Sequence, residues 1–196
     1  MVSGFDKYFQ IARCYRDEDA RGDRQLEFTQ LDIEMSFVTR EDILALIERL
    51  FNNVFKKVMN YDLPAHFRRI DYYDAMNTYG CDKPDLRFEC EIHDVAELVG
   101  KSSFEAYKTI LANKGTVKAI CAPKTEGFDF TRKYLDEVSE AAKTYGAAFV
   151  PFIKVGEGNA LSGSGAKYFT GLEAELCKEM GATAGDVIFL VAHENW

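Results

Sequence analysis

Residues 30–37 alternate between polar and apolar side chains without interruption, and this period of two restricts the segment to an extended strand with two unlike faces. One face carries the polar side chains of Gln30, Asp32, Glu34 and Ser36. The other carries the apolar side chains of Leu31, Ile33, Met35 and Phe37. The alternation by itself also fits an ordinary surface strand, whose wet face usually carries Thr, Lys or Arg. A row of acceptors instead predicts a site for a cation, either an ammonium group or a metal ion.

A second extended segment, residues 7–15, precedes this strand, so the two predict a long antiparallel hairpin. The connection, roughly residues 17–27, is too long and too charged for a tight turn, and connections of this length are usually functional or disordered. Arg16 lies at the end of the first strand among carboxylates. A guanidinium in such a place can clamp a phosphate or carboxylate, because its planar fork bonds bidentately and keeps its charge.

Several short motifs occur in and around this hairpin. They read Arg-Asp-Glu-Asp at residues 16–19, Asp-Arg-Gln at 23–25, and Glu-Phe-Thr-Gln at 27–30 with Asp32 beyond. Together they resemble motif 2 of the class II aminoacyl-tRNA synthetases, in the form of the bacterial-type aspartyl-tRNA synthetases. The runs at residues 3–11 and 82–87 resemble the same family.

The sequence departs from the common motif at three loop positions, Ala20, Gly22 and Leu26. These departures leave the expected ligands in place and bear on the rigidity of the loop.

The resemblance implies a role for several residues of the hairpin. Arg16 would be the catalytic residue, holding the α-phosphate of ATP and the carboxylate of aspartate together. Glu18 and Gln25 would bind the nucleotide, and adenine would stack on Phe28. Gln30 and Asp32 would face the aspartate substrate and receive its ammonium group.

In the loop itself, Arg21 and Arg24 would approach the acceptor end of tRNA. The resemblance implies no metal ligand among the residues of this chain.

The implied activity is that of an aspartate–tRNA ligase, which forms aspartyl-adenylate from L-aspartate and ATP and then transfers the aspartyl group to the 3′ end of tRNA(Asp). ATP is a substrate, Mg²⁺ is expected in the full enzyme, no prosthetic group is expected, and the full-length enzyme is expected to be a homodimer. At 196 residues the chain is much shorter than such enzymes, and nothing in it resembles their anticodon-binding barrel, motif 1 or motif 3. We therefore expect an internal fragment that is inactive alone. The alternative is a non-catalytic RNA- or protein-binding module derived from the insertion domain.

The expected fold is α+β: part of an antiparallel class II catalytic sheet, with the motif 2 hairpin and a helix, followed by a small α/β insertion domain. Thr39 followed by acidic residues predicts a helix start, and apolar residues at three- and four-residue spacing continue to Val58. Further on, strands are predicted at residues 116–122, 147–155 and 186–192, and helices at 131–145 and 165–180. Thr131 is the expected cap of one helix, and Gly146 and Gly181 the expected terminators.

The predicted domains are residues 1–90, the partial catalytic domain, and residues 91–196. The second resembles the GAD-type insertion domain of bacterial aspartyl-tRNA synthetases, a module also found in tRNA-dependent amidotransferases.

Two other features favour structural roles. The glycines of residues 156–165 lack the Lys-Ser/Thr of a phosphate loop, so a flexible connector is expected. Cys90 and His93 have a spacing suited to a metal but find no second pair in the sequence, so no structural zinc site is expected.

Composition predicts a cytoplasmic protein without a membrane segment. The chain has 47% hydrophobic residues, a net charge of −8 and five cysteines, which we expect to be reduced. A pI near 5.0 argues against a general nucleic-acid binder but leaves room for a local arginine cluster that contacts tRNA.

Overall fold

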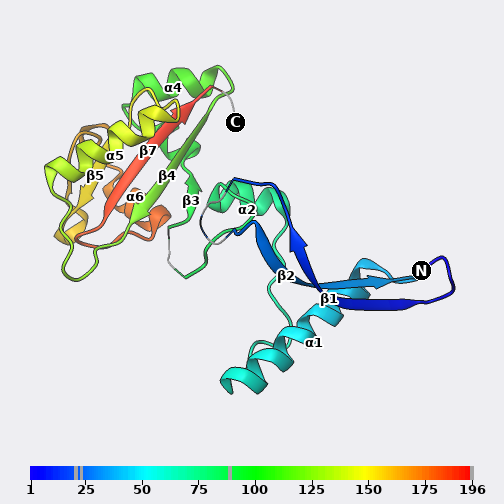
Figure 1. Ribbon diagram of the computed structural model, residues 1–196. Helices are drawn as coiled ribbons and strands as arrows, with labels where there is room; N and C mark the ends of the chain where they lie inside the picture. Colours follow the sequence, from blue (N-terminus) through cyan, green and yellow to red (C-terminus); the bar gives the residue numbers. More distant parts are fainter. Residues whose placement is uncertain (20–21, 23, 88–89, 195–196) are drawn as a thin grey trace. The chain divides into compact units, whose positions relative to one another are not determined.

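The computed structural model describes residues 1–19, 22, 24–87 and 90–194, which form two compact units, Met1–Arg69 and Ile70–Trp196 (Figure 1). Helices accompany the strands, and the strand pairs that the structure describes are all antiparallel, which confirms the predicted α+β class. The chain divides between residues 69 and 70. The next helix, α2 (Tyr72–Tyr79), belongs to the second unit because it contacts the sheet of that unit. The assignment of residues 1–90 and 91–196 to two domain families stays a prediction.

The first unit contains a hairpin of β1 (Lys7–Tyr15) and β2 (Glu27–Met35), as predicted. Its register places Gln10 opposite Asp32, and Cys14 opposite Phe28. A backbone hydrogen bond of 2.9 Å from the Arg16 N–H to the Leu26 carbonyl extends the pairing into the loop. Directly opposed residues share a face, so the register alone fixes which side chains can meet.

The helix that follows the hairpin, α1 (Arg40–Met59), begins at Thr39 with a capping box. The Thr39 hydroxyl accepts from the Asp42 N–H, and the Asp42 carboxylate accepts from the Thr39 N–H at 2.8 Å. The Thr39 N–H and the Thr39 hydroxyl both donate to the Asp42 carboxylate, and these bonds hold the pKa of Asp42 below its ordinary value. The predicted helix start at Thr39 is thus confirmed. The helix ends at Asn60, which has the left-handed conformation common at helix ends.

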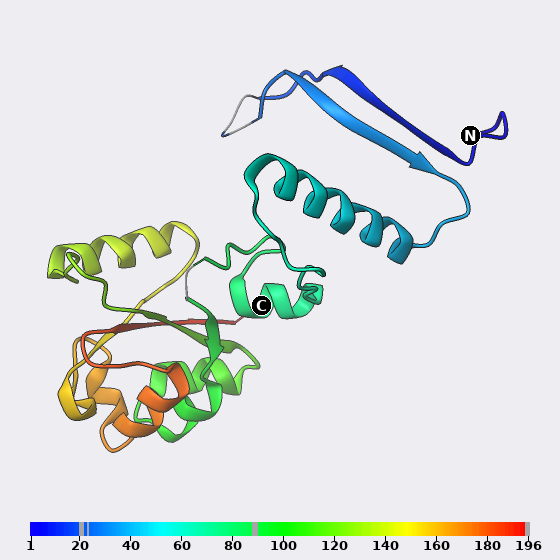
Figure 2. The same cartoon turned by 90° about the horizontal axis from the view of Figure 1, so that it is seen from below.

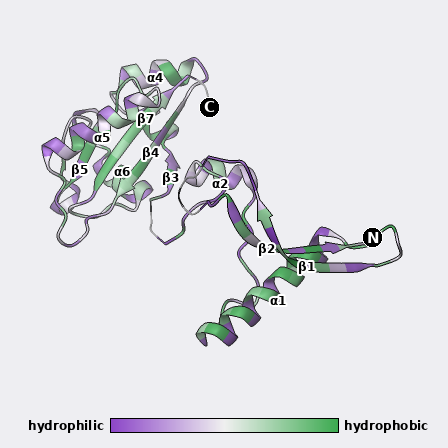
Figure 3. Cartoon of the chain, in the orientation of Figure 1, coloured by the Kyte–Doolittle hydropathy of each residue, from purple (hydrophilic) through white to green (hydrophobic). Residues whose placement is uncertain are grey.

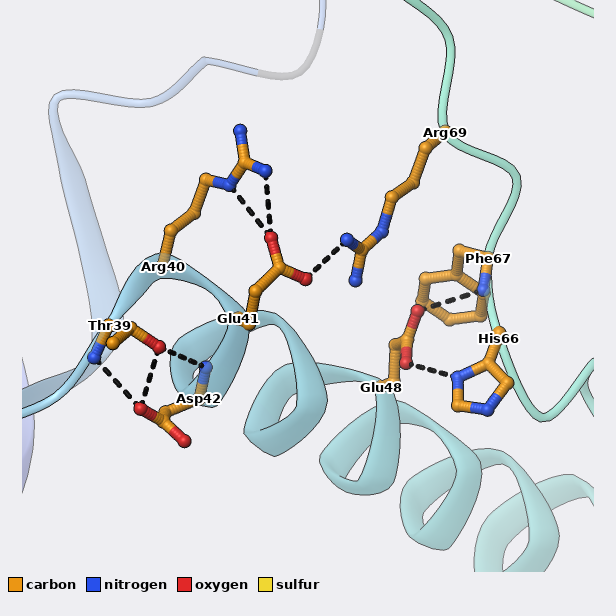
Figure 4. Close-up of polar contacts among 8 residues, drawn as sticks. All are labelled: Thr39, Arg40, Glu41, Asp42, Glu48, His66, Phe67 and Arg69. Atoms are coloured by element: carbon orange, nitrogen blue, oxygen red, sulfur yellow. Dashed lines mark hydrogen bonds and ion pairs between the residues drawn. The ribbon is translucent and has the colours of Figure 1, made fainter.

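Two carboxylates of α1 hold the chain segment that returns along the helix (Figure 4). Glu48 accepts the Phe67 N–H at 3.0 Å and lies 2.9 Å from Nδ1 of His66, while Glu41 pairs with Arg69. Hydrogen bonds, from His66 first and Phe67 second, lower the pKa of Glu48. This tether fixes residues 66–69 against the helix.

The second unit is built on a five-stranded sheet with the order β3-β4-β7-β5-β6. Its strands are β3 (Ile92–Asp94), β4 (Thr116–Ala122), β5 (Phe152–Val155), β6 (Leu161–Ser162) and β7 (Val187–His193). Its helices are α2 (Tyr72–Tyr79), α3 (Ala96–Lys101), α4 (Glu105–Ala112), α5 (Arg132–Thr144) and α6 (Glu173–Met180), with short 3₁₀ turns η1 (Glu157–Asn159) and η2 (Ala166–Phe169).

Helices cover both faces of this sheet (Figure 2). Alternate residues of β7 serve the two faces: Val187 and Phe189 pack with Leu135 of α5, whereas Ile188 and Leu190 pack with α3, α4 and α6. Strand β7 is accordingly apolar from Val187 to Ala192, whereas β4, next to it, also carries Thr116 and Lys118 (Figure 3). A central strand buried on both sides needs apolar residues at every position.

Several predicted elements of this unit agree with the structure. The strand at 116–122 is confirmed, the Thr131 hydroxyl caps α5 by accepting from the Tyr134 N–H, and Gly146 and Gly181 have φ of +96° and +59°. The Gly residues therefore end their helices in the conformation that favours glycine.

Two predicted boundaries are wrong. The strand predicted at 147–155 is confined to Phe152–Val155, since Pro151 lacks the N–H a ladder needs. The helix predicted at 165–180 is divided into η2 and α6, because Gly171 lies between them with φ of +84°. Among the helices of the described residues, none is both long and apolar enough to cross a membrane.

Candidate functional site

The open end of the hairpin brings Arg16 and Phe28 together. Arg16 follows β1, and its guanidinium carbon lies 5.3 Å from the centre of the Phe28 ring on β2. Cys14 is opposite Phe28, and Arg16 is two residues further along, so both side chains belong to the same face. A guanidinium at this distance gains from the ring quadrupole while its N–H groups stay open to other partners.

One carboxylate in the loop engages two guanidinium groups. Glu18 lies 3.7 Å from Arg16 and 3.3 Å from Arg24. The side chains of these three residues are 39–60% exposed, so the pairs add little to stability. These ion pairs hold the two guanidinium groups and one carboxylate close together. The three groups carry a net positive charge, which favours binding of an anion.

These residues line a hollow of about 410 Å³ together with Gln25. The residues around it are Arg16, Glu18, Arg24, Gln25 and Phe28, which we call the hairpin pocket. Its volume is in the range of small-ligand sites. The structure thus gathers every described residue that the sequence predicted for the nucleotide, with Arg24 beside them. Arg21, the other predicted tRNA contact, lies outside the described residues.

Further along the same face, the acceptor row continues with Gln30 and Asp32, both half-buried. The Gln10 side chain donates to Asp32 at 3.3 Å from the directly opposite position on β1. Gln30 faces Ala12, whose small side chain leaves space beside it. Gln10 is not among the predicted site residues, although the hairpin register places it opposite Asp32.

The 82–87 run, which also carries the resemblance, forms a compact turn closed by Asp85 and Arg87. The Arg87 side chain and N–H both donate to Asp85, and these bonds lower the pKa of Asp85 to about 2. Asp85 is therefore charged at neutral pH. It acts within the turn as an anchor for Arg87.

Within the described residues, no group of three or more His, Cys, Asp or Glu side chains is placed to hold a metal ion. Cys90 and His93 line a hollow together with Cys121. Burial raises the pKa of Cys90, and it raises the pKa of Cys121 to about 12. Both thiols are therefore protonated at neutral pH, which does not suit a nucleophile.

Comparisons with known proteins agree on one family. A family model described as tRNA synthetases class II (D, K and N) matches residues 1–193. The aspartate–tRNA(Asp/Asn) ligase of Treponema denticola is 52% identical over 193 residues, which cover 98% of this chain and 32% of that protein.

Two other relatives carry the same name. That of Opitutus terrae is 48% identical over 98% of this chain and 32% of the relative, and that of Borreliella burgdorferi is 47% identical over 100% of this chain and 33% of the relative. The chain thus spans about a third of the length of these relatives.

Proposed function

Because the chain belongs to the class II tRNA synthetases of the D, K and N group, we propose that it supplies the nucleotide- and aspartate-binding hairpin of an aspartate–tRNA ligase. The observation that carries this proposal is the hairpin pocket. Arg16, Glu18, Gln25 and Phe28 surround one hollow, and Asp32 lies on the same face of the hairpin.

In the proposed reaction, a carboxylate oxygen of aspartate attacks the α-phosphorus of ATP and pyrophosphate leaves. Arg16 contacts both the carboxylate and the α-phosphate, which aligns the reactants and stabilises the negative charge that grows at phosphorus. The Phe28 ring supports the adenine. Glu18 orients Arg16 in the free chain, and Gln25 supplies an amide that can bond the nucleotide.

The amino acid would lie further along the face, with its ammonium group on the acceptors Gln30 and Asp32. The hydrogen bond from Gln10 occupies one oxygen of Asp32 and leaves the other for the ammonium group. In the second step, a ribose hydroxyl at the 3′ end of tRNA attacks the aspartyl carbonyl and AMP leaves. Arg24, with Arg21, would contact the phosphates of that tRNA end.

The proposal includes a cytoplasmic location and, for the whole enzyme, a homodimer. It includes Mg²⁺ only as a companion of ATP. Among the described residues, the one carboxylate that lines the hairpin pocket is Glu18, and two arginines engage it. That arrangement does not fit a Mg²⁺ site built from this chain, so no step is assigned to the ion.

The test is the binding of a fluorescent ATP analogue, N-methylanthraniloyl-ATP, to the purified chain. We expect Arg16→Ala to weaken binding at least tenfold, because it removes the group that holds the α-phosphate. Arg40→Ala, which removes an exposed arginine at the start of α1, is the matched control and should keep the affinity of the unaltered chain. Equal affinities for the Arg16 and Arg40 variants would contradict the proposal.

A further inference from the structure

A second hollow, of about 310 Å³, lies at the start of α5 in the second unit. Residues of the 124–131 loop line it together with residues of β5 and of the turn into β7. Those that matter here are Lys124, Phe128, Phe130, Thr131, Lys154 and Gly185, which we call the α5 pocket. None of them belongs to the hairpin pocket.

Lys154 brings a half-buried positive charge to the α5 pocket. It follows Phe152 by two residues on β5 and therefore lies on the α5 side of the sheet. Its ammonium group donates to the Phe130 carbonyl at 2.6 Å, and no carboxylate in the described parts of the chain pairs with it. A neutral acceptor leaves the charge uncompensated, which favours an anion beside it.

Lys124 supplies a second ammonium group, and the fold keeps space for its side chain. A Cβ atom on Gly185 would lie 2.5 Å from Cδ of Lys124, and Gly185 has φ of +104°. The Lys124 N–H donates to buried Asp186 at 2.8 Å, which fixes the residue over the glycine. Two constraints therefore favour glycine at position 185: its positive φ, and the Lys124 side chain that lies where a Cβ atom would be.

The acidic groups near the pocket do not cancel these charges. Asp186 already accepts from the Thr183 N–H and hydroxyl, besides Lys124. Asp129 also lines the pocket, where it is one carboxylate against two lysines. Two nearby cations of α5 are paired with carboxylates, unlike Lys124 and Lys154: Arg132 pairs with Asp136, and Lys133 pairs with Glu137. The pocket is thus positive within a chain whose net charge is −8.

Aromatic rings form one wall. Phe128 is 39% exposed, and it meets Phe130 and Tyr134 edge to face, with ring centres 5.3 Å and 4.9 Å apart. These edge contacts orient the Phe128 ring. An oriented, partly exposed ring next to ammonium groups is the arrangement that takes a base by stacking and its phosphate by charge.

We propose that the α5 pocket binds a nucleoside phosphate, with the phosphate on Lys124 and Lys154 and the base stacked on Phe128. The start of α5 adds to the attraction, because its first turn has no acidic residue and the first N–H groups of a helix have no acceptor within the helix. The ligand is either a free mononucleotide or one nucleotide of single-stranded RNA, since both present the same chemistry.

The test is NMR titration of the ¹⁵N-labelled chain with AMP, with the pentanucleotide A₅ as RNA, and with inorganic phosphate. All titrations use the Arg16→Ala background, so that failure of the hairpin pocket cannot affect the result. We expect shifts at residues 124–134 and 154. Binding should weaken at least tenfold in Lys154→Gln and in Phe128→Ala, but not in Lys143→Gln, which removes an exposed charge at the other end of α5.

The probes separate the two sources of the ligand. Tighter binding of A₅ than of AMP identifies RNA, and equal or weaker binding identifies a mononucleotide. Absence of shifts at residues 124–134 with both probes would overturn the proposal. So would inorganic phosphate binding as tightly as AMP, or a Phe128→Ala affinity equal to that of Lys143→Gln.

Discussion

At the scale of single residues, two carboxylates that each have two partners differ in burial and in role. Glu18 is exposed and forms ion pairs with both Arg16 and Arg24, so either arginine can exchange this carboxylate for a bound phosphate. Glu48 is 7% exposed and is committed to the Phe67 N–H and to His66. A committed, buried acceptor serves the fold, whereas a shared, exposed one leaves the site adaptable.

Glu48 should make the first unit sensitive to acid. Because its pKa is lower in the folded chain than the ordinary 4.5, its stabilising effect is complete above that value and is lost as the pH falls through the lowered pKa. We expect the melting temperature of the first unit to fall over that interval, as followed by amide signals of α1. Glu48→Gln should melt lower at pH 7 and lose this part of the acid dependence. An unchanged pH profile in the Gln variant would contradict the assignment.

At the scale of elements, the two units differ in how much of their apolar surface is covered. In the first unit, Phe9, Ile11 and Leu31 of the hairpin are 68%, 75% and 45% exposed. A groove of about 840 Å³ lies between the hairpin and α1, lined by apolar residues of both. In the second unit, Ile188 and Leu190 of β7 are fully buried. A two-stranded sheet with one uncovered apolar face is marginal, because it hides little surface from water.

Hydrogen exchange should therefore separate the units. Amides in β1 and β2 should exchange much faster than those in β4 and β7, since opening the hairpin exposes little buried surface. Mass spectrometry of peptides from the two sheets measures this directly, with the exposed 124–131 loop as the fast reference. Equal protection of β2 and β7 would show that the hairpin is stabilised by contacts other than those described.

The sequence predicted these elements unevenly, for physical reasons. Strands 7–15 and 116–122 were predicted with the observed bounds, and the Thr39 cap placed the start of α1. The predicted starts of the strand at 147 and of the helix at 165 were wrong. The favourable side-chain pattern continues through Pro151 and Gly171, but their backbones cannot continue the strand or the helix. Single breakers outweigh a favourable pattern of neighbours.

At the scale of the whole molecule, the hairpin pocket was predictable and the α5 pocket was not. Arg16, Glu18, Gln25 and Phe28 lie within one contiguous motif, and a hairpin register brings such residues together. Lys124 and Lys154 line one pocket only because β7 is inserted between β4 and β5 in the sheet. That order depends on contacts far apart in sequence, which a local pattern does not encode.

The central claim is that one face of the hairpin binds both adenylate and amino acid. Its most direct test is the affinity of the purified chain for a non-hydrolysable aspartyl-adenylate analogue, aspartyl sulfamoyl adenosine, compared with AMP. We predict tighter binding of the analogue, with the difference removed by Asp32→Asn, which loses the charge facing the ammonium group. The difference should be retained in Glu27→Gln, a control on the other face of the same strand. Equal affinities for the analogue and AMP, or an advantage that survives Asp32→Asn, would contradict the account.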